Sequence, residues 1–335
     1  MMIAYHLLFQ DPVHFGLEGI GQEAVEQAFR SDSLWGAVLQ KWFLLFDDTP
    51  EQLCTNTPFS ISSCFPFING VRFFPLPMGA LDAVIEDAAR HKAIEGMPGV
   101  KEWRKVRYVA EPLFRKALKE KLLPADVSLD QVFPMAIYEK NNITGATFQQ
   151  HEQRPRIMTD QMNGGVSESA FFYCTDQFFG DSAGLFFLAR FDGDAVREKF
   201  EAALMLLGDC GIGADRSIGR GGFVFFSQSV DFPAPTAPAA WLTLSLYHPT
   251  RDEVQQGVLT GGRYSLIKRS GPGGGFHVSR FRRSDCWMLE EGAVIPFHAQ
   301  GDAPCVLKQS EFIPHNIYRN GGAFCIPLQE GLHND

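Results

Sequence analysis

The chain has 335 residues and a net charge of −9, with 45% hydrophobic and 21% charged residues. This composition is typical of a globular protein of about two domains. No apolar run reaches the ~20 residues of a membrane span, and the first residues lack the features of a signal peptide, so we expect a cytoplasmic protein without a membrane partner. The cysteines form no C-x-x-C pair, which indicates neither a zinc site nor a disulfide framework, and we expect them to be reduced and mostly buried.

The chain begins with a predicted strand and a predicted helix. Apolar residues alternate in IAYHLLFQ and place Ile3, Tyr5, Leu7 and Phe9 on one face of a strand. A helix follows in RSDSLWGAVLQKWFLLF, where apolar residues recur at helical spacing and Ser31 is placed to cap the helix. We expect the apolar stripe of this helix to lie in the core.

The middle of the chain is irregular at first and then strongly patterned. Residues 47–180 hold short strands punctuated by Pro and Gly and two predicted helices, near 81–93 and 111–122, which indicates an insertion. Three regular elements follow, namely a buried strand, an amphipathic helix and a second strand, at 184–191, 192–211 and 223–232.

The order of these elements predicts an α+β fold. Strand, helix, irregular pairings, strand, helix and strand is the order of a ferredoxin-like βαββαβ sandwich. We therefore predict a first domain over 1–233, with an insertion at about 47–180, and a linker in the proline-punctuated stretch 231–240. A second small α+β domain is predicted over 234–335, with a strand in WLTLSLYH, a short helix at 251–256 and strands near 263–268, 286–296 and 323–328.

Basic residues are concentrated even though the net charge is negative. Residues 263–283 hold six basic side chains and no acidic one: Arg263, Lys268, Arg269, Arg280, Arg282 and Arg283. Another basic cluster spans 101–107, which is interpreted equally well as an ordinary solvated face. We infer a bipolar surface, with a basic part that can meet phosphates and an acidic part that is expected to bind another subunit.

The most unusual segment is GIGADRSIGRGGF, residues 211–223, which has five glycines and two arginines. It lacks the Lys of a P-loop and the sixth-position Gly of a dinucleotide fingerprint, and it follows a predicted helix instead of preceding one. A helix C-terminus carries partial negative charge, so an anion would be held by main-chain N–H groups exposed by glycine and by Arg216 and Arg220. An extended phosphodiester chain fits this chemistry, and the alternative is a mobile connector.

The same segment resembles the glycine-rich loop of the RAMP superfamily of CRISPR proteins. Four other stretches, in order along nearly the whole chain, resemble segments of the fourth subunit of the type III-A, or Csm, effector complex: DPVHFG with RSDSLWGAVL, RPRIMTDQMNGGVSESAFFY, EEGAVIPF and HNIYRNGGAFCIPL. Gln161, Ala293 and Asn320 depart from the family's pattern, so sister RAMP proteins of other type III complexes stay open as alternatives.

The resemblance implies a non-catalytic RNA-binding subunit made of two ferredoxin-like (RRM-like) domains. Such a subunit grips the 5′ handle of the crRNA and docks on the large polymerase/cyclase-like subunit and on the backbone-forming RAMP subunit. In this sequence the resemblance assigns the handle to Gly211, Gly213, Arg216, Ser217, Gly219, Gly221 and Gly222. Other candidate contacts are Arg154, Arg156, Arg220, Lys268, Arg269 and Arg319, for which structural roles are the alternative, together with His14 and Phe15 as possible loop contacts.

An endoribonuclease is the main alternative function. Sister RAMP proteins cleave precursor RNA without a metal, by general acid–base catalysis, and the candidates here are His6, His14 and His151. His6 lies in an apolar strand and is expected to be a satisfied core histidine, so His14 is the better candidate. No set of Asp, Glu and His has metal-ligand spacing, and neither a metal nor a cofactor is predicted. A third possibility is a purely structural interaction protein whose glycines act as hinges.

Overall fold

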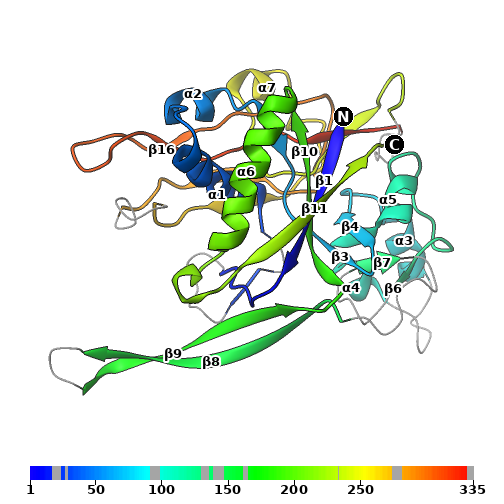
Figure 1. Cartoon of the computed structure of the whole chain (residues 1–335). Coiled ribbons are helices and arrows are strands. Elements are labelled where there is room, and N and C mark those ends of the chain that lie inside the picture. Colours follow the sequence, from blue (N-terminus) through cyan, green and yellow to red (C-terminus); the bar gives the residue numbers. More distant parts are fainter. Residues whose placement is uncertain are drawn as a thin grey trace.

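The computed structural model describes residues 1–16, 24–26, 29–90, 99–129, 136–138, 147–160, 165–232, 234–273 and 281–329. Figure 1 shows a curved sheet that carries two long helices, α1 (Ser31–Leu45) and α6 (Asp194–Cys210), and a long hairpin, β8 (Gln149–Asp160) with β9 (Gly165–Phe179), that projects from the body. In the part of the chain so described, no helix is both long and apolar enough to cross a membrane.

The largest sheet in the described residues has nine strands, in the order β11-β1-β10-β3-β4-β5-β7-β6, with β2 paired to β10 beside this path. Its strands are β1 (Met2–Phe9), β2 (Phe59–Ile61), β3 (Phe65–Ile68), β4 (Val71–Pro75), β5 (Tyr108–Ala110), β6 (Ser128–Leu129), β7 (Ala136–Tyr138), β10 (Ala183–Phe191) and β11 (Phe223–Val230). The pairs are antiparallel except β5 with β7. The strands predicted at the N-terminus and on both sides of α6 are confirmed.

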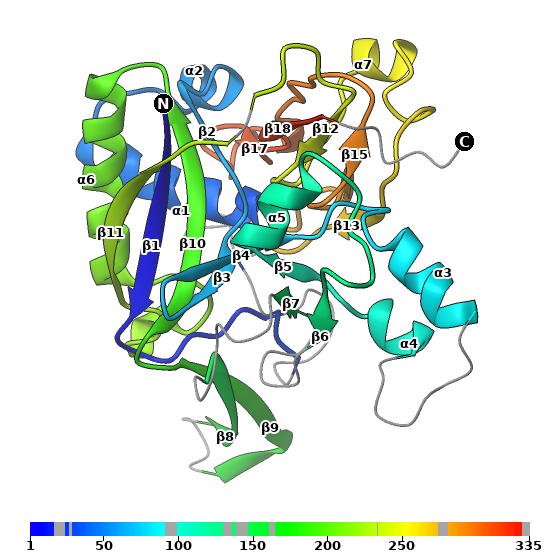
Figure 2. The same cartoon turned by 90° about the vertical axis from the view of Figure 1, so that its right-hand side faces the viewer.

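β1 lies inside this sheet because both of its faces are apolar. Tyr5 and Leu7 are fully buried on the face that α1 and α6 cover, where the ring of Tyr5 stacks on Phe187 with a centroid distance of 5.2 Å. Ala4 is fully buried on the other face, in a second core cluster. Figure 2 shows α6 on one side of β11, β1 and β10, and α5 (Glu111–Ala117) on the other, while α1 packs in the same core cluster as α6. Burial on both faces fixes the end of β1, from which the chain continues beneath the glycine-rich loop.

Helix α1 confirms the predicted helix but not its predicted cap. Arg30 is the N-cap residue, without a side-chain capping bond, and Ser31 is the first helical residue. The Ser31 hydroxyl instead accepts a hydrogen bond from the main-chain N–H of Leu246 at 3.0 Å. The cap prediction is wrong because this side chain joins the helix to the C-terminal part of the chain.

The short helices lie mostly where the sequence predicts them. α3 and α5 match the helices expected near 81–93 and 111–122, although α5 ends at Ala117 and residues 91–98 lie outside the described residues. α7 matches the helix expected at 251–256, and Thr250 caps it by accepting a bond from Glu253 N at 3.2 Å. The bounds are α2 (Pro50–Thr55), α3 (Asp82–Arg90), α4 (Val100–Trp103), α7 (Arg251–Gln255) and the 3-10 helix η1 (Arg216–Ile218).

The hairpin of β8 and β9 is a feature that the sequence pattern did not predict. Its pairing runs from Gln149 opposite Phe179 to Asp160 opposite Gly165. Near its base, Gln177 exchanges main-chain hydrogen bonds of 2.9 Å with Val13, which follows β1. The hairpin is therefore attached to the same segment that lies beneath the glycine-rich loop.

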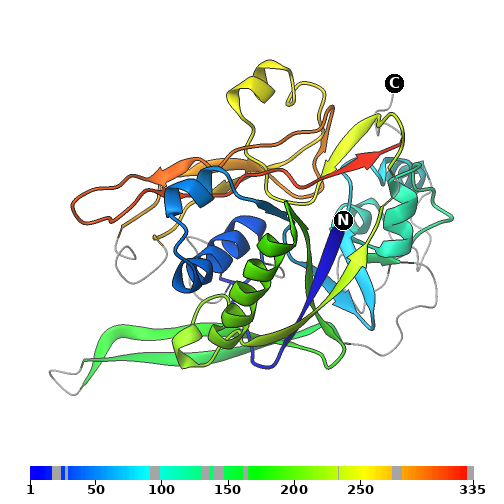
Figure 3. The same ribbon diagram turned by 45° about the horizontal axis from the view of Figure 1, so that its top comes forward.

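Residues beyond 233 form small sheets that share a core with the large one. Leu242, Phe324 and Ile326 pack in one cluster with Phe74 and Phe186 of the large sheet. The strands are β12 (Ala240–Thr243), β15 (Val294–Ile295) and β18 (Cys325–Leu328) in one sheet, β13 (Leu266–Arg269) with β14 (Cys286–Leu289), and β16 (Cys305–Leu307) with β17 (Ile317–Tyr318). The strands expected after 240 are found, but in the described residues they form no single four-stranded sheet, and the predicted boundary at 233/234 does not divide the core. Figure 3 shows α1 and α6 between the hairpin and these C-terminal strands.

The cysteines are free thiols, as the sequence predicts. Cys54, Cys64, Cys174, Cys286 and Cys325 are buried, and the other two are exposed. Burial raises the pKa of the Cys325 thiol to about 11, which keeps it protonated and unreactive at neutral pH.

Candidate RNA-binding site

The glycine-rich loop, residues 211–222, is a series of left-handed turns between α6 and β11. Positive φ angles occur at Gly211 (78°), Gly213 (88°), Asp215 (61°), Gly219 (78°) and Gly221 (78°). Glycine adopts this conformation without steric penalty, and Asp is one of the few other residues that tolerate it. The loop thus has a defined backbone path that most other residue types would strain.

Three of the glycines are required by contacts of the chain with itself: Gly211, Gly213 and Gly221. A Cβ on Gly221 would overlap the backbone of Ile212, whose N–H donates to the Gly221 carbonyl at 3.0 Å. A Cβ on Gly213 would lie 2.6 Å from the carbonyl oxygen of His14. The resemblance assigned these glycines to the RNA backbone, whereas in the structure protein atoms occupy the space that their missing side chains leave. Gly222, the last residue of the loop, likewise accepts a hydrogen bond from Gln10 N at 3.1 Å.

The apex of the loop, residues 216–219, is the part that faces solvent. Arg216, Ser217, Ile218 and Gly219 are all exposed. A Cβ on Gly219 would meet no atom of the described residues within 4 Å. The guanidinium of Arg216 forms no ion pair within the described part of the chain. A ligand can therefore reach Arg216 and the main chain beside it.

Below the apex, Arg220 is bound to the hairpin. Its guanidinium lies 2.6 Å from Oδ2 of Asp176 in β9, and Arg154 of β8 approaches the same oxygen at 3.2 Å. Arg154 also pairs with Glu152 at 3.1 Å, while the Asp176 side chain is only 1% exposed. The sequence-based prediction placed both arginines on RNA, but the structure gives both of them protein partners that join the loop to the hairpin.

Arg156 makes the second link between hairpin and loop. It lies 2.7 Å from Oδ2 of Asp215, which also accepts a contact from the Cys174 thiol at 3.5 Å. Burial would raise the pKa of Asp215, but the hydrogen bond and charge of Arg156 outweigh burial and hold this pKa below its ordinary value. The pair is therefore ionised at neutral pH. Arg156, predicted as an RNA contact, is engaged with the loop itself.

The acidic partners are the residues that sequence reasoning missed. Asp176, Asp215 and Glu152 balance the three arginines at the base of the loop. Asp215 lies between Gly213 and Gly219 in the glycine-rich loop, and an acidic side chain beside Arg216 could have indicated an ion pair within the protein. Asp176 lies 44 residues from Arg220, and no spacing rule connects the two.

His14 and Phe15 support the loop from beneath. The main-chain N–H of Ala214 donates to the His14 carbonyl at 2.9 Å. His14 is 3% exposed, and its Nδ1 lies 2.7 Å from the carbonyl oxygen of Thr175, which can only accept, so this nitrogen carries the hydrogen. Phe15 is buried and packs against Phe29 with a centroid distance of 5.0 Å. The structure thus brings both residues against the loop, on its protein side.

The other two histidines that were candidates for catalysis, His6 and His151, do not contact the loop in the same way. His6 is 4% exposed, its ring is parallel to that of Phe226 at 4.5 Å, and its Nδ1 has no hydrogen-bond partner among the described residues. The expectation of a satisfied core histidine is therefore half right, because the ring is buried but one nitrogen is left unbonded. Burial lowers its pKa to about 4, so it is neutral at pH 7. His151 lies in β8 and contacts Gln149 at 3.1 Å.

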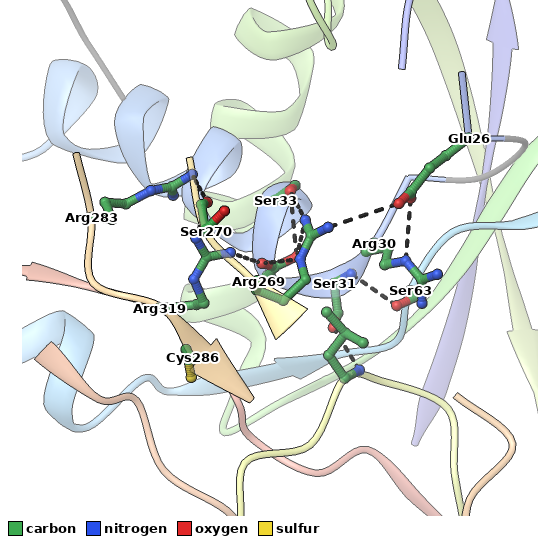
Figure 4. A network of polar contacts seen from close by, with 12 residues as sticks. Glu26, Arg30, Ser31, Ser33, Ser63, Arg269, Ser270, Arg283, Cys286 and Arg319 are labelled. Atoms are coloured by element: carbon green, nitrogen blue, oxygen red, sulfur yellow. Dashed lines mark hydrogen bonds and ion pairs between the residues drawn. The ribbon is translucent and has the colours of Figure 1, made fainter. Parts of the chain in front are cut away.

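Arg269 and Arg319 belong to a second, internal cluster (Figure 4). Arg269 Nε lies 3.1 Å from Oδ2 of Asp32, and Arg319 binds the same carboxylate. Arg319 also donates to the carbonyl oxygen of Ser270 at 2.7 Å. Both arginines are buried and join α1 to the C-terminal strands, which favours the structural role that the sequence analysis left open for them over a contact with RNA. Lys268 points to solvent and pairs with Asp285 at 2.7 Å.

Gln161, which departs from the family's pattern, and Arg280 of the basic run 263–283 lie outside the described residues. In the ranges that the structure describes, no group of three or more His, Cys, Asp and Glu side chains is arranged to hold a metal ion.

Comparison with known proteins places this geometry in a family. Residues 236–328 match the family model of the CRISPR Csm4 C-terminal domain. No curated protein matches the chain. The chain is similar to one from the crystal structure of a Csm3–Csm4 subcomplex of the type III-A CRISPR-Cas interference complex, with a TM-score of 0.65, 15% identity and coverage of 98% of this chain and 99% of that chain. It is also similar to one from the Csm1–Csm4 cassette in complex with pppApA, with a TM-score of 0.61, 18% identity and coverage of 98% and 97%.

The whole-chain likeness in fold and the matched C-terminal region define a chain with the fold of a RAMP-type CRISPR protein. Residues 236–328 are therefore similar to the C-terminal domain of Csm4, and the whole chain has the fold of the Csm4-containing structures named above. The resemblance inferred from the glycine-rich loop and four other stretches of the sequence is thereby confirmed.

Proposed function

We propose that the chain is a non-catalytic crRNA-binding subunit that grips the 5′ handle with the apex of its glycine-rich loop. The observation that carries the proposal is the exposed guanidinium of Arg216, which has no ion-pair partner in the described residues, on a loop whose base is held by Arg156 and Arg220. A guanidinium can donate two parallel hydrogen bonds to phosphate oxygens, and exposed main-chain N–H groups can bind the same backbone. Contacts of this kind hold RNA in register without reading its sequence.

The solved structures that resemble the chain support two protein partners. They are complexes of Csm4 with Csm1 and of Csm4 with Csm3. By analogy, we propose that this chain docks on the large polymerase/cyclase-like subunit and on the backbone-forming RAMP subunit, in the cytoplasm.

The finer fold assignment is also a proposal. The strand order β11-β1-β10-β3, with α1 and α6 on one face, supports a ferredoxin-like βαββαβ unit in the N-terminal part. The insertion then lies between β3 and β10. For the C-terminal part, the small sheets and the short helix α7 support an α+β unit, without the strand order of a second ferredoxin-like domain among the described residues.

His14 supports a role in binding over a role in cleavage. A general base needs hydrogen-bond access to the proton that it removes. His14 is buried, and its Nδ1 is bound to the carbonyl oxygen of Thr175. This arrangement suits a residue that positions the loop, and we propose that the protein leaves its RNA intact.

The test compares Arg216→Ala with the wild type on RNA copied from the CRISPR repeat. Loss of one charge-assisted phosphate contact should weaken binding about 10- to 100-fold and reduce the slope of log K against log salt by about 0.7. Fluorescence anisotropy at several salt concentrations measures both quantities. Arg251→Ala, which removes an exposed arginine of α7, is the matched control and should bind as the wild type does.

An unchanged salt slope in Arg216→Ala would contradict the proposal. The RNA should be recovered intact after incubation in EDTA. Cleavage that disappears with His14→Ala would instead establish the ribonuclease alternative.

A further inference from the structure

An exposed tryptophan stands on the outer face of the β13–β14 ribbon. The strands pair so that Lys268 lies opposite Trp287. Trp287 is 58% exposed, and Leu266, two residues before Lys268 and therefore on the same face, is 53% exposed. A large aromatic side chain left so exposed beside an apolar neighbour marks a surface that a ligand can cover.

The surroundings of Trp287 are basic. Lys268, directly opposite Trp287, is exposed, as is Arg282, which stands three residues before Asp285 in the chain. Asp285 pairs with Lys268 at 2.7 Å. The hydrogen bond from Lys268 and the charge of Arg282 lower the pKa of Asp285, which places both cations within electrostatic reach of it. Of the basic side chains in this stretch, Lys268 and Arg282 are exposed, whereas Arg263 pairs with Asp82 and Arg269 with Asp32. This local charge suits a polyanion.

The inner face of the ribbon is fixed to the body. Met288 is fully buried, and Arg269, on the same face as Met288, binds Asp32 of α1. Arg319 holds the end of β13 through its bond to the Ser270 carbonyl. The indole therefore stands on a backbone that is already ordered, so a ligand that covers it need not order the strand.

One short segment connects the ribbon with the glycine-rich loop. Arg269 lies 3.8 Å from Oε1 of Glu26, and Glu26 N donates to the carbonyl of Phe15 at 2.7 Å. The neighbouring His14 accepts the bond from Ala214 of the loop. A chain of contacts through Glu26, Phe15 and His14 thus links the ribbon to the loop.

We propose that Trp287 is a stacking platform for a base of single-stranded RNA, with Lys268 and Arg282 on the adjoining phosphates. The inference rests on the proposed RNA-binding function and adds a second contact to it. Stacking of one base on an aromatic side chain contributes about 5- to 150-fold in affinity and tolerates any base. A protein partner fits less well. Trp is enriched in the desolvated centre of protein interfaces, but Lys is depleted there, and Lys268 lies directly opposite Trp287.

The test measures binding of the full-length protein to the repeat RNA and to copies that carry single abasic nucleotides. Trp287→Ala should weaken binding of intact RNA about 5-fold or more, and Trp287→Phe should retain most of the affinity. At one position, removal of the base should weaken wild-type binding but not binding by Trp287→Ala. The salt slope of Trp287→Ala should equal that of the wild type, since no phosphate contact is removed.

Tryptophan fluorescence gives a second readout. Of the five tryptophans, Trp35, Trp42 and Trp103 are buried, and Trp241 is partly buried with its ring edge-on to His298. Trp287 is thus the most exposed, and RNA should quench mainly its emission. The quenching should disappear in Trp287→Phe. Because the side chain is exposed, the variants should keep the wild-type thermal midpoint.

The outcomes separate the two proposals. Wild-type affinity in Trp287→Ala overturns the stacking platform and leaves the role of Arg216 intact. Failure of the wild-type protein to bind the repeat RNA overturns both. A variant that binds RNA normally but no longer joins a protein subunit of the complex identifies the ribbon as a protein interface and also overturns the inference.

Discussion

A single carboxylate at Asp32 holds two buried guanidiniums. Burial would raise the pKa of Asp32, but the charges and hydrogen bonds of Arg269 and Arg319 outweigh burial and hold this pKa below its ordinary value. Asp32 is therefore ionised at neutral pH and compensates two positive charges in the interior. Its removal would leave those charges without their partner.

We predict that Asp32→Asn lowers the free energy of unfolding by about 3–5 kcal/mol, because it breaks a buried ion pair and leaves charged groups uncompensated. Urea denaturation measures the change. Asp285→Asn is the matched control, since its pair with Lys268 is about half exposed and screened by water, and it should leave the free energy of unfolding nearly unchanged. Similar losses in the two variants would show that the Asp32 cluster is not a structural support.

For single residues, the sequence identified the basic side chains but not the carboxylates with which they pair. The run of basic residues from 263 to 283 is visible in the sequence, and so is its local charge. Asp32, however, lies 237 residues before Arg269. Only the fold shows that Arg269 is buried and that Lys268, one residue earlier on the opposite face of the strand, is exposed.

At the scale of elements, glycines of the loop differ in what they contribute. Gly219 and Gly221 have the same φ of 78°. Around Gly219 a Cβ would find open space, whereas at Gly221 it would overlap the backbone of Ile212. The same substitution therefore tests backbone strain at one position and close packing at the other.

Gly219→Ala should lower the free energy of unfolding by about 1 kcal/mol through the left-handed backbone alone. Gly221→Ala should lower it by about 3 kcal/mol, because the Ile212 segment must also move. Chemical denaturation of both variants checks the difference. Equal losses would mean that the loop adapts freely and that its glycines are not packed as described.

The elements that the sequence predicted best are those that form the core. β10 and α6 carry apolar patterns because they pack on one another, and periodicity therefore locates them. The hairpin escaped prediction because it projects from the body. β8 is mostly polar, contains Pro155, and has no buried side chain between Gln149 and Ile157 to impose alternation. Its attachment by ion pairs leaves no periodic signal.

At the scale of the whole molecule, one core cluster crosses the predicted domain boundary. Leu242, Leu244, Phe324 and Ile326 are fully buried, and they pack in one cluster with strands from the first half of the chain. The N-terminal part therefore depends on residues beyond 233 to cover one face of its sheet.

A fragment of residues 1–233 should accordingly fail to reach the native state. Without the C-terminal strands, Phe74 and Phe186 would lose part of their cover, and the exposed apolar surface should bind the dye ANS. Near-UV circular dichroism and ANS fluorescence, with the full chain as control, measure the effect. A fragment that unfolds cooperatively with native aromatic signals would show two independent domains.

The carbonyl of His14 and the backbone of Ile212, which close around the glycines, set the shape of the loop before any ligand arrives. Segments that fold only on binding give up roughly 2–5 kcal/mol of their interaction energy to ordering. Because this loop is already ordered by contacts with its own chain, it does not lose that interaction energy on binding. The contact of Arg216 at its apex can therefore slow the dissociation of a bound ligand by nearly its full free energy.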